Sequence, residues 1–355
     1  MARVGWIDIC RGIAMVLVVL GHNLGLWQTA SKMGVFIYLF HMPLFFFITG
    51  LTLKLQEGKA YYVDKVISLI ATYLILSIIM LPIISFFNPD AQLIDIVSGI
   101  FYGTGHTIQL VPMWFIPCLA LAVLITYLSN YLLSNLEYFK KISLFSRYLI
   151  FALVLLVLGI LSIKIPQHHF HTLLAWGNFE DSGPLWSADV AIVGAAFIYF
   201  GGAFRLWIAA REIDQVPVVY LTSIVLISLV FMIAIMNLGA AVDLNFRKIN
   251  EPGLAIPAMV LGIALIVSFS IIVTKLNFIS KLLIIVGQST LVILWLHNGL
   301  QNRFINLFMS PGPYSWILGF AIGLLVPVLI DVLIIKKCKL ISKFIYPKFS
   351  GYFKS

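Results

Sequence analysis

The sequence predicts an all-α, polytopic transmembrane helix bundle of about ten spans, with both termini on the cytoplasmic side. Hydrophobic residues make up 61% of the 355 residues and charged residues only 10%. The mean hydropathy is +1.05. A soluble domain contains about 25% charged residues. A soluble fold of this length could not bury so much apolar surface, whereas a lipid bilayer covers it.

Apolar runs of about 17–25 residues, bounded by charges, proline or glycine, mark the expected spans. The chain has a basic residue near its start, Arg3, and an apolar run, but Asp8 and Arg11 interrupt the approach and no A-x-A site follows, which favours a retained helix over a cleaved signal peptide. The expected spans are residues 9–27, 33–53, 66–87, 113–133, 148–163, 185–208, 217–237, 254–274, 282–302 and 314–335.

The distribution of basic residues predicts the orientation. With the N-terminus inside, the inner segments hold 17 of the 23 lysines and arginines, the outer segments hold 5, and Arg11 lies in the first helix. The positive-inside rule therefore favours cytoplasmic termini and an even number of spans. The net charge of +9 follows from this bias, so no nucleic-acid partner is expected. We expect one membrane-embedded domain over residues 1–355, without a separate soluble domain.

The first expected helix carries four polar residues, and ionisable groups inside a membrane are functional candidates. Asp8 and Arg11 are three residues apart, so they can pair on one helix face. Arg11 and His22 are eleven residues apart, which places both on one stripe, about 16 Å apart along the axis. Asn23 follows His22 directly. In the simpler interpretation, Asp8 and Arg11 only anchor the helix end, and His22 only forms a hydrogen bond to a neighbour.

Two further histidines are expected at the depth of His22. His41 lies eight residues into the second span, and His297, followed by Asn298, lies about fifteen residues into the ninth. Three neutral imidazoles could bind a metal, but no ligand spacing such as H-E-x-x-H is present, so no metal site is expected. Because histidine titrates near neutral pH, we expect a site for proton transfer or acyl transfer.

Other features have simpler explanations. Trp114 lies between two prolines and could anchor at the membrane interface. His168, His169 and His171 fall in an expected outer loop, where a solvated loop is a better interpretation than a metal site. Three lysines of an expected inner loop could bind phosphates or only follow the positive-inside rule: Lys54, Lys59 and Lys65.

The first two expected helices resemble a large family of bacterial membrane O-acyltransferases, acyltransferase family 3. The segment WIDICRGIA at residues 6–14, followed by VVLGH at 18–22, is similar to the family's opening signature. The family's pattern of arginine, ten residues and histidine falls on Arg11 and His22. FHMPLFFFITG at 40–50 resembles the second-helix pattern, although Thr49 stands where serine is common.

Two later segments are similar to weaker family patterns, so the resemblance extends over positions 6 to 298. They are MWFIP at 113–117, and GQST at 287–290 with LWLHN at 294–298. The fucose 4-O-acetylase-like branch of sugar O-acetyltransferases is the most similar. Many members carry an additional extracytoplasmic SGNH-type domain, whereas this chain ends about 20 residues after its last expected helix and resembles the membrane-only kind.

The resemblance implies an O-acyltransferase of the bacterial cytoplasmic (inner) membrane, which uses cytoplasmic acetyl-CoA as co-substrate and no bound cofactor. It would acylate a hydroxyl of a cell-surface carbohydrate or of its lipid-linked precursor. His22, Arg11 and Asp8 would be catalytic: His22 as general base or transient acyl carrier, Arg11 bound to phosphate or the pantetheine arm, and Asp8 holding Arg11. Lys54, Lys59 and Lys65 would bind the donor phosphates. Substrate contacts are expected from His41, Asn23, Trp114, His297 and Asn298.

Two other classes also contain many helices and intramembrane polar residues. A secondary transporter or flippase of a polar metabolite does not predict the segments at 6–22. The membrane-bound acyltransferases that use an asparagine and a histidine fit His297 and Asn298 poorly, because the rest of that pattern is absent. The acceptor sugar, the length of the acyl group and the oligomeric state, including a homo-oligomer, stay open.

Overall fold

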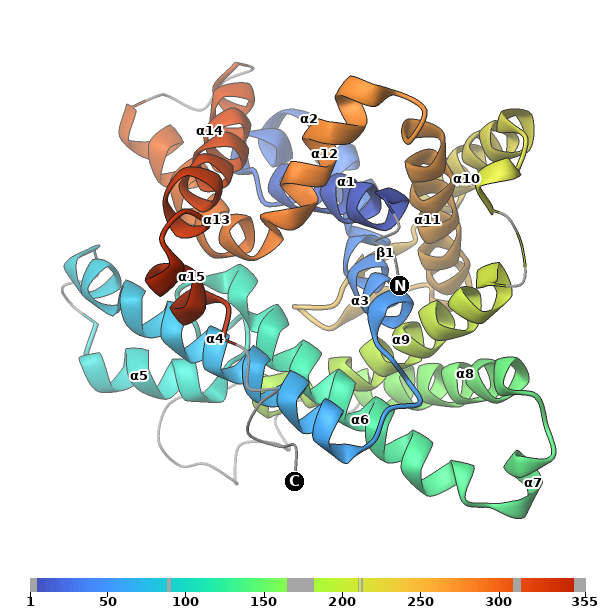
Figure 1. Cartoon of the computed structure of the whole chain (residues 1–355). Coiled ribbons are helices and arrows are strands. Elements are labelled where there is room, and N and C mark those ends of the chain that lie inside the picture. The colour runs from blue at the N-terminus through green and yellow to red at the C-terminus, as the bar shows by residue number, and fades with distance from the viewer. Residues whose placement is uncertain are drawn as a thin grey trace. The chain divides into compact units, whose positions relative to one another are not determined.

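A computed structural model describes residues 5–87, 91–164, 182–209, 211, 213–308 and 314–347. Helices dominate these segments, as Figure 1 shows. The first helices are α1 (Gly5–Gly21), α2 (Leu24–Tyr38), α3 (His41–Thr52), α4 (Lys59–Phe87), α5 (Leu93–Tyr102), α6 (Phe115–Ser134), α7 (Glu137–Lys140) and α8 (Leu144–Ile163). The later helices are α9 (Ala188–Ala209), α10 (Val218–Asn237), α11 (Pro252–Val273), α12 (Asn277–Gln288), α13 (Thr290–Phe308), α14 (Ser315–Ile330) and α15 (Lys339–Ile345).

The helix lengths and compositions confirm an all-α membrane protein. In the described segments, eight helical stretches are long and apolar enough to cross a membrane, or nine if the bent pair α12–α13 forms one span. α1 has 17 residues and is shorter than any of these. The predicted number of ten spans and the cytoplasmic side of the termini stay predictions.

The chain forms two compact units. The first unit comprises Met1–Ile48 and Ile208–Ile334, and the second comprises Thr49–Trp207 and Ile335–Ser355. The three histidines discussed above belong to the first unit, and the three lysines and Trp114 to the second. The prediction of one functional domain over residues 1–355 is not tested by this division.

In the first unit, α1 packs along α12 and α11. Two glycines allow the close approach of α1 and α12. A methyl group added to Gly12 would overlap the carbonyl oxygen of Leu283, and one added to Gly287 would overlap that of Asp8. Small residues let helix backbones approach closely in membrane proteins. This packing holds the polar start of α1 against α12.

The first predicted span, residues 9–27, is wrong in its C-terminal part. α1 ends at Gly21, and His22 and Asn23 form a break before α2. The Oδ1 atom of Asn23 accepts a hydrogen bond from the backbone N–H of Leu26 at 3.1 Å. Asparagine is among the preferred N-capping residues, because its side chain satisfies an N–H group of the first helical turn. His22 therefore lies at a helix end and not inside a continuous helix.

The second and ninth predicted spans are also interrupted. Residues 33–53 divide between α2, which is distorted at Ala30, and α3, which begins at His41. Residues 282–302 divide between α12 and α13, which meet at Ser289 with a bend of 82°. His41 is therefore the first residue of a helix, and His297 lies in the helix that follows the bend.

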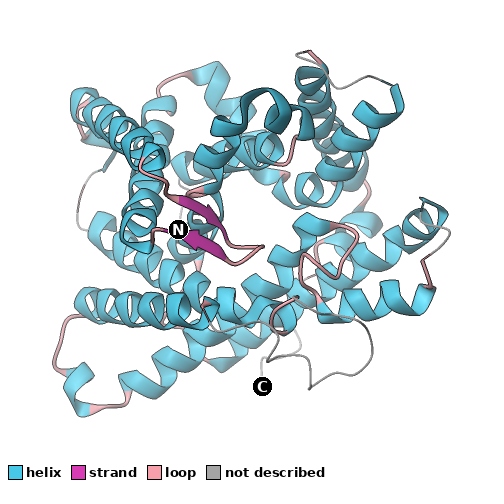
Figure 2. Ribbon diagram, turned by 180° about the vertical axis from the view of Figure 1, so that it is seen from behind, coloured by secondary structure: helices cyan, strands magenta, loops and turns pink. Residues whose placement is uncertain are grey.

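A two-stranded hairpin follows α10, in a segment predicted to be an outer loop. Strands β1 (Ala241–Asp243) and β2 (Lys248–Asn250) are antiparallel, with Val242 opposite Ile249. Figure 2 shows this hairpin beside the helices. β1 contacts α2, so the hairpin packs in the first unit near the break at His22.

In the second unit, α4 packs along α6, and α15 contacts α4. α5 lies in a segment predicted to be a loop, and the Tyr73 hydroxyl of α4 donates a hydrogen bond to the Ile100 carbonyl of α5 at 2.6 Å. The start of α6 continues from a short 3₁₀ helix, Val111–Trp114. Close packing of α3 on α9 requires Gly50, because an added methyl group would overlap the carbonyl oxygen of Ile198.

Candidate active site

The break after α1 brings three imidazole rings together in the first unit. The ring centroid of His22 lies 5.2 Å from that of His297 and 6.4 Å from that of His41. His297 is fully buried, His41 is 3% exposed, and His22 is half-buried. The three residues that were expected at one depth thus form a cluster, here called the histidine cluster.

The backbone fixes the same tautomer in each ring of the histidine cluster. Nδ1 of each ring faces the carbonyl oxygen four residues earlier: at 2.9 Å for His22, 3.1 Å for His41 and 2.7 Å for His297. A carbonyl oxygen only accepts hydrogen bonds, so Nδ1 must carry the proton. In a neutral ring, Nε2 then carries the lone pair and can accept a proton. This arrangement provides a base at Nε2 of His22.

Side-chain amides from α13 hold the break in place. The Nδ2 atom of Asn302 donates to the His22 carbonyl at 3.0 Å and to Oδ1 of Asn298 at 2.6 Å. Its Oδ1 atom accepts from the N–H of Leu24 at 3.2 Å. Asn302 therefore satisfies backbone groups on both sides of the break, one of them on His22.

Asn23 forms a second set of contacts. Its Nδ2 atom donates to the Trp316 carbonyl at 3.0 Å and to Oε1 of Gln301 at 3.4 Å. Asn23 and Gln301 are both fully buried. The residue after His22 is thus tied to α13 and α14.

The predicted pairing of Asp8 and Arg11 is confirmed. Nη1 of Arg11 lies 3.5 Å from Oδ1 of Asp8, and the two side chains are 30% and 5% exposed. Both residues lie on α1, in the stretch that packs on α12.

Sequence reasoning missed three neighbours of the histidine cluster. Tyr38 lies beside two of its rings, with centroid distances of 4.7 Å to His41 and 6.0 Å to His22. Gln301 and Asn302 were not selected either. Helical spacing places Gln301 four residues after His297 and Asn302 four residues after Asn298, but only the contacts between helices show that they adjoin Asn23 and His22. Tyr38 is the last residue of α2 and His41 the first of α3, so helical spacing does not relate that pair.

The hairpin adds an acidic group near Tyr38. Asp243 on β1 is close enough to Tyr38 to act on it electrostatically. Burial raises the pKa of the Asp243 carboxyl above its ordinary value, and the hydrogen bond from the Phe246 N–H at 3.0 Å opposes this shift. Trp27 completes the aromatic contacts, since its ring centroid lies 5.4 Å from that of Tyr38. Aromatic rings beside a carboxylate provide apolar faces and hydrogen-bond acceptors for a polar ligand.

The three candidate phosphate-binding lysines lie in the second unit, near the loop that joins α3 to α4 (residues 53–58, the α3–α4 loop). Nζ of Lys54 pairs with Oε1 of Glu57 at 3.0 Å. The Lys54 backbone N–H donates to the Tyr61 hydroxyl at 3.2 Å, and Nζ of Lys65 lies 5.4 Å from the centre of the Tyr61 ring. Lys59 is exposed at the start of α4.

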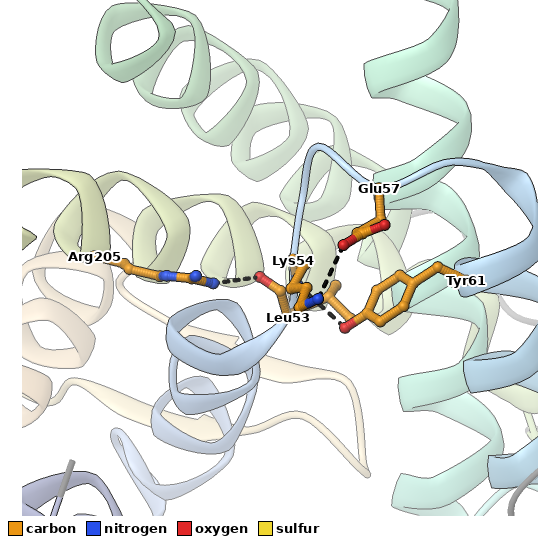
Figure 3. Close-up of polar contacts among 5 residues, drawn as sticks. All are labelled: Leu53, Lys54, Glu57, Tyr61 and Arg205. Carbon is orange, nitrogen blue, oxygen red and sulfur yellow. Dashed lines mark hydrogen bonds and ion pairs between the residues drawn. The ribbon is translucent and has the colours of Figure 1, made fainter. Parts of the chain in front are cut away.

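Polar contacts from neighbouring helices fix the backbone of the α3–α4 loop. Nη1 of Arg205 donates to the Leu53 carbonyl at 3.1 Å, as Figure 3 shows together with the Lys54 contacts. The Leu55 carbonyl accepts from the Tyr62 hydroxyl at 3.2 Å and from Nδ2 of Asn130 at 3.1 Å. The loop backbone is therefore held in place, with the Lys54 side chain at the surface.

Trp114 and the loop histidines are the remaining residues that the sequence singles out. Trp114 is 3% exposed in the second unit, with its ring centroid 6.5 Å from that of Phe115, so it packs as a core residue there. Its expected substrate contact stays a prediction. The described residues contain no group of three histidine, cysteine or acidic side chains that could hold a metal ion. The histidines of the expected outer loop, at 168, 169 and 171, lie outside the described residues.

The comparisons with known proteins identify the family. No curated protein and no solved structure matches the chain. A family model described as an acyltransferase domain, that of acyltransferase family 3, matches residues 4–334 and covers nearly the whole chain. The chain is therefore a member of acyltransferase family 3, a membrane acyltransferase by family.

Proposed function

We propose that the protein is an O-acyltransferase that moves an acetyl group from cytoplasmic acetyl-CoA to a hydroxyl of a cell-surface carbohydrate or of its lipid-linked precursor. The observation that carries this proposal is the histidine cluster at the break after α1, where Nδ1 of His22 is held by the Val18 carbonyl and Nε2 is left to act as a base. A base at this position is what acyl transfer to an alcohol requires.

In the proposed reaction, His22 activates the acceptor. Nε2 of His22 takes the hydroxyl proton while the hydroxyl oxygen attacks the thioester carbonyl carbon. The carbon–sulfur bond then breaks, and the CoA thiolate leaves and takes up the proton. In the alternative that the residues also allow, Nε2 first attacks the thioester and carries the acyl group before the hydroxyl receives it. Trapping an acylated protein with labelled donor separates these two routes.

Arg11 and the lysines would bind the donor. Acyl-CoA carries phosphates far from its thioester, so a donor path needs cations at one place and a base at another. Arg11, held by Asp8 on α1, would contact a phosphate or the pantetheine arm, a role that suits the planar guanidinium. Lys54, Lys59 and Lys65 would contact the nucleotide phosphates.

Side chains near the histidine cluster would bind the acceptor. His41, His297 and Asn298 lie in or next to the cluster and would offer hydrogen bonds to sugar hydroxyls. Asn23 uses both hydrogens of its Nδ2 within the protein, so it would contact the acceptor only through the second lone pair of Oδ1. The sequence resemblance further favours the fucose 4-O-acetylase-like branch and the bacterial cytoplasmic membrane. Acetyl is the proposed acyl group, and a longer group such as succinyl is the variant to compare.

Isotope-labelled acetyl-CoA tests the proposal directly. Purified protein in detergent, mixed with labelled acetyl-CoA and a surface glycan fraction, should release CoA and transfer the label to the glycan. A transporter or flippase would instead move label across proteoliposomes without cleaving the thioester, and that result would overturn the proposal. Mass spectrometry of surface polysaccharide, with and without the protein, identifies the acceptor.

A further inference from the structure

α13 buries three polar nitrogen atoms that have no hydrogen-bond partner among the described residues: Nε1 of Trp295, Nε2 of His297 and Nε2 of Gln301. Two of them belong to His297, a member of the histidine cluster, and to Gln301. Both residues are 0% exposed, and they stand four residues apart on one face of the helix. More than nine in ten buried polar groups in proteins are hydrogen-bonded, so two exceptions in adjacent turns require an explanation.

The orientation of the Gln301 amide follows from its neighbours. Oδ1 of Asn23 accepts from the Leu26 N–H, so Nδ2 of Asn23 is the atom that faces Gln301, at 3.4 Å. A donor must face an acceptor, which fixes Oε1 of Gln301 toward Asn23 and leaves its NH₂ group without an acceptor. Gly323 on α14 allows this side chain to fit, because an added Cβ would lie 3.0 Å from Cβ of Gln301.

This donor is connected to the proposed base through Asn23 and through His297. Gln301 contacts Asn23, the residue after His22, and it lies one helical turn from His297. The rings of His297 and His22 are 5.2 Å apart between centroids. A fixed, buried N–H donor thus lies in the neighbourhood of a base that acts on an acyl acceptor.

We propose that Gln301 is a further catalytic residue, whose amide NH₂ group donates a hydrogen bond to the acyl carbonyl oxygen during transfer. The proposal rests on the proposed acyltransferase function. As the hydroxyl oxygen bonds to the carbonyl carbon, the π electrons of the carbonyl move onto its oxygen, and the hydroxyl proton goes to His22. The Gln301 N–H stabilises this oxyanion until the carbon–sulfur bond breaks and the carbonyl reforms. Prepositioned donors in a site without water are especially effective at this task.

If Gln301 has only a structural role, its variants should behave differently. Gln301 could serve only as the acceptor for Asn23, in which case Oε1 matters and the NH₂ group does not. Gln301→Met removes both the acceptor oxygen and the donor. Gln301→Glu keeps an acceptor oxygen toward Asn23, but burial favours its protonated carboxyl, whose O–H still donates a hydrogen bond, so the donor is lost only where that carboxyl ionises. The exposed Gln28 on α2 offers matched controls, Gln28→Glu and Gln28→Met.

The first measurement is steady-state transfer with labelled acetyl-CoA. Loss of one oxyanion donor typically lowers kcat by about 10²–10³-fold. We expect this loss in Gln301→Met and a smaller loss in Gln301→Glu, with the KM for acetyl-CoA and the thermal unfolding midpoint close to those of the wild type. The Gln28 controls should keep the wild-type kcat. A wild-type kcat in Gln301→Met, or a loss that follows KM and thermal stability, would overturn the proposal.

The second measurement does not depend on turnover by the variants. Isotope-edited infrared spectra of acetyl-CoA with ¹³C at the carbonyl report the hydrogen bond to that oxygen. The carbonyl band of the bound donor should lie at lower frequency in the wild type than in Gln301→Met. Equal frequencies would reject a role for the amide even if wild-type transfer is observed. If the wild type itself transfers no acyl group, the proposed function fails and this inference fails with it.

Discussion

Polar side chains are mostly buried at the histidine cluster, whereas they are exposed around the α3–α4 loop. At the cluster, His41 and His297 are buried and His22 is half-buried, and the neighbouring amides of Asn23 and Gln301 are buried as well. Nε2 of His297 and Nε2 of Gln301 have no partner among the described residues. In the loop and along the start of α4, the side chains of Lys54, Lys59 and Lys65 are exposed, and Lys54 is paired with Glu57 over 3.0 Å. A buried polar group without a partner costs folding free energy, and a ligand that binds it would remove this cost. An exposed ion pair contributes little to the free energy of folding. The comparison favours the cluster as the place of chemistry and the loop as a weak electrostatic contact.

After the losses expected at His22 and Gln301, the largest effect is expected from Asn302, which binds the carbonyl of His22. Asn302→Ala removes this contact and the acceptor for the Leu24 N–H, so His22 loses its fixed position. A small displacement of a catalytic group can lower the rate by about 100-fold. We expect a kcat loss of this order in the labelled transfer assay. Asn135→Ala, at an exposed asparagine of the second unit, is the control. An unchanged kcat in Asn302→Ala would show that the break does not position His22.

Arg11→Lys should have the next largest effect. Lysine keeps the charge beside Asp8 but loses the planar donors that bind a phosphate or the pantetheine arm. We expect at least about a tenfold loss in kcat/KM for acetyl-CoA, on the order of one charge-assisted hydrogen bond. Arg211→Lys, at an exposed position, should keep the wild-type value. Full activity of Arg11→Lys would show that Arg11 contributes only its positive charge, which anchors the end of α1.

Gly287→Ala tests the helix packing beneath the cluster. The added methyl group would overlap the Asp8 carbonyl, so α1 and α12 must separate. Overpacking of this kind costs about 1–3 kcal/mol. Unfolding of the purified protein in detergent should therefore begin at a lower temperature. Gly299→Ala on α13 is the matched control, since nothing lies within 4 Å of its added Cβ. Equal melting of the two variants would contradict the close approach.

The smallest effects are expected from the lysines of the α3–α4 loop and of the start of α4. Because Glu57 already pairs with Lys54, Lys54→Ala should raise the KM for acetyl-CoA by less than Lys59→Ala does. Exposed pairs contribute about 0.2–1 kcal/mol, so both increases should stay below about fivefold, with kcat unchanged. Initial rates over a range of donor concentrations provide both constants. A tenfold rise in KM for Lys54→Ala would make this loop a principal donor site and weaken the contrast drawn above.

The sequence predicts the helical elements well because long apolar runs require lipid and form helices. It does not predict where helices break. The break at Asn23 depends on a side chain that caps the next helix, and the bend at Ser289 interrupts an apolar run that continues through it. Hydropathy averages over both features. The hairpin between α10 and α11 was likewise missed, because its strands are only three residues long.

The histidines of the candidate site can be predicted from the sequence, whereas the amides of Gln301 and Asn302 cannot. Histidines inside apolar runs are conspicuous, and estimates of depth along separate helices grouped His22 with His41 and His297. Gln301 and Asn302 are uncharged, so the search for ionisable residues inside apolar runs does not select them. Each nevertheless follows a predicted site residue on α13, His297 or Asn298, by four positions. Their importance depends on contacts across helices that sequence spacing alone does not reveal.

Acyl transfer by His22→Ala tests the central claim most directly. The variant and the wild type are purified in parallel, checked for equal thermal unfolding, and given labelled acetyl-CoA with the glycan acceptor. Loss of a general base typically lowers the rate by about 10²–10⁴-fold, and we expect a loss in this range with intact folding. Wild-type transfer by a folded His22→Ala protein would contradict the assignment of the histidine cluster as the site of acyl transfer.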